Sequence, residues 1–213
     1  MSEQSVSRNR QQERSDTSTR LLLEAAGDLI SEVGYAGMTL AAVGERAGYS
    51  RGIVTIKFGS KANLLAAVVD RITSGWSHKR WLPEIKDKNG LDGFLALIKA
   101  ISDEFERDTR GVRLLYALMF EAVQSREEGL REQFVEWHRA YRADLADILR
   151  RGIKDGSVRS GIVVEDEAAA VISGLRGIGY QWIIDPLGFA AVPALRHLYE
   201  STEARLRPLD DRS

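Results

Sequence analysis

Helical periodicity runs through nearly the whole chain, and it restricts the possible fold more than any other feature. Apolar residues recur at alternating spacings of three and four in residues 22–33, 94–105, 134–148 and 168–182. This spacing places them on one face of a helix. No segment alternates between apolar and polar residues for long enough to indicate a sheet. The pattern therefore predicts an all-α protein.

The size and composition of the chain exclude several classes of protein. The 213 residues are 44% hydrophobic and carry a net charge of −1, which suits a globular protein and not a polycationic coat or an acidic tail. Cysteine is absent, so disulfides and thiolate metal sites are excluded. The apolar stretches are far shorter than the roughly 20 residues of a membrane span. The polar N-terminus is not that of a secretory signal. We expect a cytoplasmic protein without a membrane partner.

Two short helices separated by a glycine are predicted between residues 39 and 58. Thr39 and Ser50 are suited to cap helices over 40–47 and 51–58, and Gly48 ends the first of these helices. This is the helix-turn-helix pattern, in which the second helix enters the major groove. Double-stranded DNA is therefore the predicted partner.

The second of these short helices carries side chains that suit DNA. Arg51 can bind guanine in a bidentate manner, and Thr55 lies one turn later on the same face. Gly52 allows close approach of the backbone, Lys57 and Lys61 suit phosphates, and helix N-termini present N–H groups to phosphates. The candidate DNA-binding residues are Thr39, Ser50, Arg51, Gly52, Thr55, Lys57 and Lys61.

The N-terminal arm and the charge balance do not decide how much electrostatic attraction contributes to DNA binding. Residues 1–16 are too polar to bury a face, so we expect a mobile arm there. Its arginines are either part of a solvated tail or reach the minor groove or the phosphates of DNA. Residues 1–61 hold eight basic and seven acidic groups, 8 − 7 = +1, so clustering on the second short helix matters more than total charge. We place the DNA-binding domain at 17–62 and a second helical domain at 63–207.

Aromatic, methionine and histidine side chains gather in the middle of the chain. At helical spacing such residues are mostly core, but the same types line ligand pockets. The three histidines lack metal-ligand spacing, so we expect no metal and no cofactor. His138 either packs in the core or points into a pocket. The candidate pocket residues, which favour an apolar or aromatic small molecule, are Trp76, Trp81, Tyr116, Met119, Phe120, Phe134, Trp137, His138 and Tyr141.

The run from Gly48 to Gly52 also matches Gly-x-Ser-x-Gly, the nucleophile elbow of some hydrolases. That elbow requires a strand before the serine, whereas the residues before Ser50 have a helical pattern. Ser50 is better explained as a helix cap. No carboxylate pair, nucleotide-binding loop or metal cluster points to catalysis, so we do not expect an enzyme.

Several of these residues carry a resemblance to a known family. Gly34-Tyr35, Thr39-Leu40, Ala47-Gly48-Tyr49-Ser50-x-Gly52, Phe58 and Ser60-Lys61 stand where TetR-type transcriptional regulators have their pattern. The match covers residues 20 to about 70. Thr55 replaces the usual tyrosine, Lys57 the usual histidine and Gly44 a common alanine. More loosely, residues 174–186 followed by an amphipathic helix resemble the last two helices of the family's ligand-binding domains.

The resemblance implies a homodimeric repressor that a small-molecule effector releases from a palindromic operator. The last two helices would pair with their copies in a four-helix bundle. An alternative function is a helical ligand sensor, or a partner-binding protein, that no longer binds specific DNA. The candidate dimer residues could also belong to the intramolecular core. They are Ala168, Val171, Leu175, Ile178, Trp182, Leu195 and Leu198.

Overall fold

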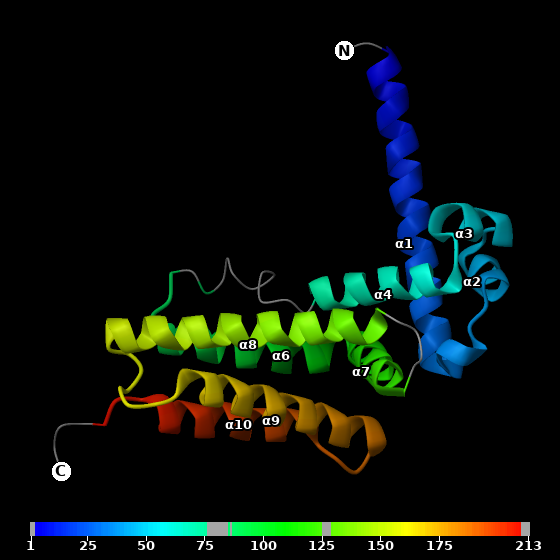
Figure 1. Ribbon diagram of the computed structural model, residues 1–213. Coiled ribbons are helices and arrows are strands. Elements are labelled where there is room, and N and C mark those ends of the chain that lie inside the picture. Colours follow the sequence, from blue (N-terminus) through cyan, green and yellow to red (C-terminus); the bar gives the residue numbers. More distant parts are fainter. Residues whose placement is uncertain (1–2, 76–84, 86, 125–128, 210–213) are drawn as a thin grey trace. The chain divides into compact units, whose positions relative to one another are not determined.

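A computed structural model describes residues 3–75, 85, 87–124 and 129–209, with side chains from residue 11 onward. These residues form helices joined by turns and contain no strand, which confirms the all-α prediction. The described helices (Figure 1) are α1 (Glu3–Gly37), α2 (Leu40–Ala47), α3 (Arg51–Phe58), α4 (Lys61–Gly75), α6 (Gly90–Arg107), α7 (Thr109–Gln124), α8 (Leu130–Asp155), α9 (Val164–Ile184) and α10 (Ala191–Leu206).

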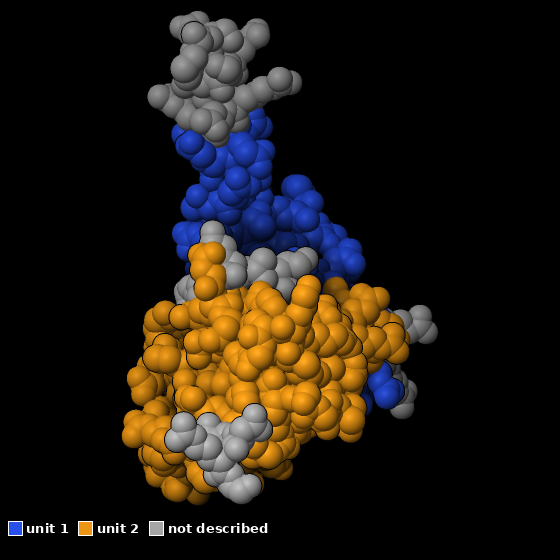
Figure 2. Space-filling view, turned by 90° about the vertical axis from the view of Figure 1, so that its left-hand side faces the viewer, with its two compact units in different colours: residues 1–71, 117–131 blue, residues 72–116, 132–213 orange. Residues whose placement is uncertain are grey.

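The chain divides into two compact units, which Figure 2 colours separately. Unit 1 comprises residues 1–71 and 117–131, and unit 2 comprises residues 72–116 and 132–213. Unit 1 therefore holds α1, α2 and α3. Unit 2 holds α6, α9, α10 and nearly all of α8.

The division between the units falls inside α4, later than the predicted boundary at residues 62 and 63. Most of α4 belongs to unit 1 because its side chains are tied to α1. Arg71 Nη2 lies 2.8 Å from Glu24 Oε1 and completes an ion pair. The Glu24 pKa is lowered by hydrogen bonds and charge from Arg20 and Arg71, although burial, the largest single influence, acts to raise it.

The predicted mobile arm differs from the structure, in which α1 begins at Glu3. Glutamine, arginine and glutamate are good helix formers, and they dominate this segment. Gln12 also donates a hydrogen bond to Asp16 at 2.9 Å, one helical turn away. Gly34 interrupts the helical backbone of α1, with φ of 72° and ψ of 169°.

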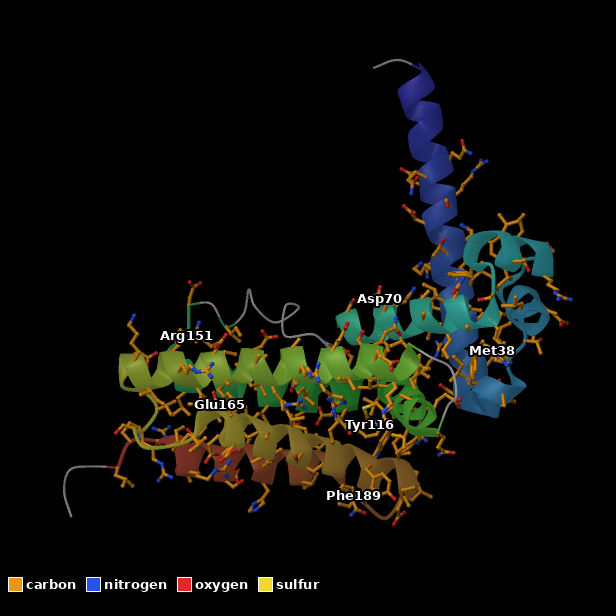
Figure 3. The ribbon with its side chains drawn as sticks, in the orientation of Figure 1. Met38, Asp70, Tyr116, Arg151, Glu165 and Phe189 are labelled. Atoms are coloured by element: carbon orange, nitrogen blue, oxygen red, sulfur yellow. The ribbon has the colours of Figure 1, made fainter. Side chains whose placement is uncertain are left out.

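The caps of the two short helices are mostly as predicted. Thr39 Oγ1 accepts a hydrogen bond from the Ala42 amide at 3.1 Å, and Gly48 adopts the left-handed conformation with φ 76° and ψ 26°. Met38, just before the cap, is fully buried (Figure 3). The prediction for Ser50 is only half right: it occupies the N-cap position, but its hydroxyl makes no capping hydrogen bond.

Gly44 sets how closely α2 approaches the start of α3. A Cβ atom at this position would lie 2.8 Å from the Tyr49 carbonyl oxygen and 3.1 Å from the Arg51 nitrogen. Real Cβ atoms do not come so close to backbone atoms. Glycine at position 44 therefore permits a tight turn between the two helices.

Unit 2 is a helical bundle around an apolar core. Phe94 and Leu97 of α6, Leu149 of α8, Val171 of α9 and Leu195 of α10 are each exposed by 1% or less. A Cβ on Gly174 would lie 3.0 Å from Leu198, so α9 and α10 are in close contact. The core thus uses the residues that the helical periodicity places on one face of each helix.

No described helix is by itself both long and apolar enough to cross a membrane. One bent pair, Arg51–Phe58 with Lys61–Gly75 at 71°, passes on length and composition alone.

Candidate functional site

The outward face of α3 carries three of the seven predicted DNA-binding residues. Val54 is fully buried and fixes the helix to unit 1. Arg51, Gly52 and Thr55 are exposed. Ile56 is 82% exposed, which is unusual for a large apolar side chain and suggests an external contact.

Contacts within the chain do not explain why positions 51 and 52 of this face are arginine and glycine. Among the described residues, no hydrogen bond or ion pair involves the Arg51 guanidinium. The nearest atom to a Cβ placed on Gly52 is Ser50 Oγ at 3.6 Å, which is an ordinary contact. Glycine at position 52 costs helix stability and removes no clash within the chain. Both residues are therefore available to a partner.

Thr55 is on the same face but uses its hydroxyl proton internally. Thr55 Oγ1 donates to the Arg51 carbonyl at 3.1 Å. What Thr55 offers a partner is its methyl group and the remaining acceptor capacity of its oxygen. A thymine methyl is a suitable contact for such a methyl group.

The two lysines are held against α1. Lys57 Nζ donates to the Ser15 carbonyl at 3.1 Å and to Thr19 Oγ1 at 3.0 Å. Lys61 Nζ donates to the Ala36 carbonyl at 3.1 Å and lies 4.4 Å from the centre of the Tyr35 ring. Both ammonium groups thus brace α1 against the helix-turn-helix, and their predicted phosphate contacts stay a prediction.

An open groove of about 720 Å³ separates the N-terminal part of α1 from α3. Arg14 and Ser15 line it from α1, and Tyr49, Ile53 and Lys57 line it from the helix-turn-helix. In Figure 1 this part of α1 extends beyond α2 and α3. The groove is therefore a second surface of unit 1, next to the exposed face of α3.

The aromatic candidates for a ligand pocket do not all come together. Phe134, Trp137, His138 and Tyr141 form a cluster along α8 in unit 2, with Trp137 and His138 ring centres 4.9 Å apart. Met119 and Phe120 fall in unit 1. Trp76 and Trp81 lie outside the described residues.

Tyr116 of α7 contacts α9 next to this cluster. Its hydroxyl donates to the Arg176 carbonyl at 3.1 Å and to the Leu175 carbonyl at 3.3 Å (Figure 3). Gly179 leaves the space that the Tyr116 ring occupies, because a Cβ there would overlap the phenol. The tyrosine therefore sits at the α7–α9 contact beside Arg176.

Arg176, which sequence reasoning missed, lies over the aromatic cluster. Its guanidinium carbon is 4.8 Å from the centre of the Trp137 ring. Its Nε atom is shielded from water and makes no hydrogen bond to a described residue. The same is true of Trp137 Nε1 and Gln133 Oε1. The available signal was an arginine inside the apolar stretch of residues 168–182.

Burial keeps the titratable members of the cluster uncharged near neutral pH. Desolvation lowers the pKa of His138 to about 4, helped by the charges of Arg176 and Arg142. Desolvation raises the pKa of Tyr141 to about 12, partly opposed by Arg176. Burial likewise raises the Tyr116 pKa, against the charge and hydrogen bond of Arg176.

The predicted dimer residues fall into two groups. Ala168, Val171, Leu175 and Leu195 are exposed by 3% or less within one chain. This prediction is wrong for these four residues, because they pack the intramolecular core and have no surface left for a partner. Ile178, Trp182 and Leu198 are half-buried and keep some exposed surface. Trp182 also packs edge-to-face on Phe105, with ring centres 5.7 Å apart.

The exposed face of α9 was missed in the sequence. It includes Tyr180, which is 48% exposed, and Ile184, which is 64% exposed. The small residues Ala170, Ser173 and Gly177 precede them on the same face at helical spacing and are exposed too. The heptad-like pattern marked the buried face of α9 and so pointed away from this one.

The hydrolase alternative lacks the structure it requires. Ser50 follows α2, a helix, and precedes α3. A nucleophile elbow needs a strand before the serine. The Gly-x-Ser-x-Gly match is thus part of the helix-turn-helix.

Two family models match most of the chain. The model for bacterial regulatory proteins of the tetR family matches residues 22–68. The model for the C-terminal domain of BetI-type transcriptional repressors matches residues 92–207. The first match contains the helix-turn-helix, and the second contains the aromatic cluster of α8 together with Arg176 of α9 (the α8–α9 cluster).

Individual proteins agree with the family models. The HTH-type transcriptional regulator TtgR of Pseudomonas putida is 26% identical over 175 residues, 78% of this chain and 80% of the relative. The fatty acid metabolism regulator of Bacillus subtilis is 28% identical over 143 residues, 67% and 72% of the two chains. SmeT, the repressor of the Stenotrophomonas maltophilia efflux pump SmeDEF, shares the fold in its triclosan complex. That comparison has a TM-score of 0.79 at 22% identity and covers 91% of this chain and 93% of SmeT.

The fold, the helix-turn-helix and the two matching models lead to one conclusion. The chain belongs to the TetR family of bacterial regulatory proteins, with a BetI-type C-terminal domain.

Proposed function

We propose that this regulator is a cytoplasmic homodimeric repressor that reads a palindromic operator with α3. A small apolar or aromatic effector would bind in unit 2 and release the DNA. The exposed face of α3 is the observation that carries this proposal. The Arg51 guanidinium has no hydrogen-bond or ion-pair partner among the described residues, and Gly52 avoids no internal clash.

The chemistry of this face suits base recognition in the major groove. An unpaired guanidinium can bind the O6 and N7 atoms of guanine. Gly52 would let the helix backbone approach the duplex, while Thr55 and Ile56 present methyl groups to thymine. Lys57 and Lys61 would act mainly by holding α1 against the reading helix.

Dimerisation would use the exposed face of α9 together with the half-buried Trp182 and Leu198. Small side chains at Ser173 and Gly177 allow two helices to approach closely, and Ile184 supplies apolar area. A two-fold dimer would place the two α3 helices at a spacing of about 34–36 Å or a multiple, which calls for a palindromic site.

Release by an effector would act through α4. This helix starts in unit 1 and ends in unit 2, so movement of its C-terminal end is passed along it to the DNA-binding unit. An effector shifts the equilibrium only by the difference in its affinity for the two states.

Selection of duplexes from a random pool tests DNA recognition. The full-length protein should enrich a palindromic sequence, and Arg51→Ala should fail to enrich the same sequence. Arg150→Ala is a matched control, because Arg150 is an exposed arginine of unit 2 that pairs with Asp147 and Glu165. Enrichment of no sequence by the wild type would favour the sensor without specific DNA binding.

A further inference from the structure

Three polar atoms in the α8–α9 cluster are buried without a hydrogen-bond partner among the described residues. They are Trp137 Nε1, Arg176 Nε and Gln133 Oε1. Gln133 and Trp137 stand four residues apart on α8 and so share one face. Arg176 lies across from them on α9, over the Trp137 ring. Buried polar groups are normally satisfied by a hydrogen-bond partner, so three unpaired atoms in one cluster indicate a site for a ligand.

The cluster carries positive charge, and no described carboxylate pairs with its arginine. No described acidic side chain forms an ion pair with Arg176. Its aromatic neighbours His138, Tyr141 and Tyr116 are neutral. Arg142 adds a second positive charge nearby, and the carboxylate of Asp144 acts on Tyr141. A partly buried cation without a counterion is unfavourable unless something else supplies the negative charge.

The surroundings of these donors are aromatic. Phe134 contacts Trp137 edge-to-face, with ring centres 6.0 Å apart. The Tyr141 ring stacks on Trp137 at 6.1 Å. A ligand that reaches the two N–H groups would therefore lie with its body against aromatic rings.

We propose that Trp137 and Arg176 form the anion-binding end of the effector site. The effector is then an amphipathic organic anion, a carboxylate on an aromatic or aliphatic body. One carboxylate oxygen would accept from Trp137 Nε1–H and the other from the Arg176 guanidinium. The Gln133 amide can turn to present its NH₂ group to the same anion. This inference rests on the proposed role of unit 2 as the effector-binding domain.

Two sets of matched compounds test the charge requirement by calorimetric titration of the full-length protein. One set is 2-naphthoate, 2-naphthalenemethanol and 2-naphthylmethylammonium. The other is dodecanoate, dodecanol and dodecylammonium. In at least one set we expect the carboxylate to bind about tenfold or more tightly than the alcohol, and the ammonium compound to bind more weakly still.

Substitutions then test which residues cause the preference for the carboxylate. Arg176→Met should remove the preference for the carboxylate, and Trp137→Phe should weaken carboxylate binding while keeping the ring. Arg176→Lys keeps the charge and should retain part of the preference, which tests the site even where Arg176→Met unfolds. Arg113→Met is the control, since Arg113 lies over the ring of a different tryptophan, Trp182, at the same 4.8 Å.

Several outcomes overturn the anion site. These are equal or tighter binding of the alcohol or the ammonium compound, no carboxylate binding up to about 1 mM, and a preference that survives both Arg176 substitutions. Operator release is measured separately. A carboxylate that binds through Arg176 without affecting DNA leaves the anion site intact and contradicts effector gating. Release of the operator by an alcohol but not by a carboxylate would contradict the anion site and leave effector gating intact.

Discussion

Arg51 is the side chain on which base recognition by α3 should depend most. Arg51→Ala should weaken binding to the selected operator by about 1–3 kcal/mol, because one bidentate contact to a guanine is lost. It should also relax base preference at one position in each half-site. Fluorescence anisotropy on the operator and on single-base variants measures both effects, with Arg150→Ala as the control. Unchanged affinity for every duplex would show that α3 is not the reading helix.

His138 makes stability depend on pH in a defined direction. Its pKa is about 4 in the folded protein, against 6.5 as the ordinary value. Between these values the unfolded chain binds more protons than the folded chain, so acid favours unfolding. Stability should be constant with respect to this group above pH 6.5 and should fall as the pH drops towards 4.

Urea unfolding at a series of pH values measures this dependence, with His138→Gln for comparison. The neighbours that oppose protonation are Arg176 and Arg142, together with the rings of Phe134 and Trp137. The stability of the wild type should fall relative to that of the variant between pH 6.5 and pH 4, and the difference between them should be constant above pH 6.5. Parallel curves over the whole range would contradict the assignment.

Within the helix-turn-helix, alanine should have opposite effects on the free energy of unfolding at Gly44 and at Gly52. Gly44→Ala should destabilise the protein by about 1–3 kcal/mol, because the new methyl group meets the backbone of the turn before α3. This loss exceeds the gain of up to about 1 kcal/mol in helix propensity. Gly52→Ala should be neutral or stabilising but should weaken DNA binding.

Chemical denaturation and anisotropy on the same two variants separate these effects. Gly52→Ala controls for the added methyl group in a short helix of the same unit. Loss of stability in both variants, or in neither, would contradict the distinction between an internal and an external reason for glycine.

The sequence predicted the elements better than their contacts. Caps such as Thr39 and breaks such as Gly48 are local, so spacing and residue type are enough to locate them. Lys57 is different, because its partner Ser15 lies in a segment expected to be mobile. Its position depends on how α1 and α3 pack, which no local pattern encodes.

The same limit explains the missed residues of unit 2. Helical spacing identified Phe134, Trp137 and Tyr141 as one face of α8, but Arg176 reaches them from another helix. On α9 the apolar seam indicated a buried face. Whether that face meets α10 or a second chain depends on the tertiary fold, and Val171 and Leu175 proved to be core.

At the scale of the whole molecule, dimerisation can be tested without disturbing the protomer. Nothing lies within 4 Å of a Cβ placed on Gly177, so Gly177→Arg should fold normally. If the α9 face forms the interface, the variant should sediment as a monomer and bind the operator more weakly. Glu136→Arg, at an exposed position of α8, is the control for an added arginine. A dimeric Gly177→Arg protein would place the interface elsewhere.

We expect a dimer of this regulator to read DNA through paired α3 helices. The most direct measurement is the salt dependence of binding to the selected palindrome, to its half-site and to a scrambled duplex. The palindrome should bind most tightly, with a slope that corresponds to roughly 6–10 phosphate contacts per dimer. Equal affinities and equal slopes for the three duplexes would contradict sequence-specific recognition by a dimer.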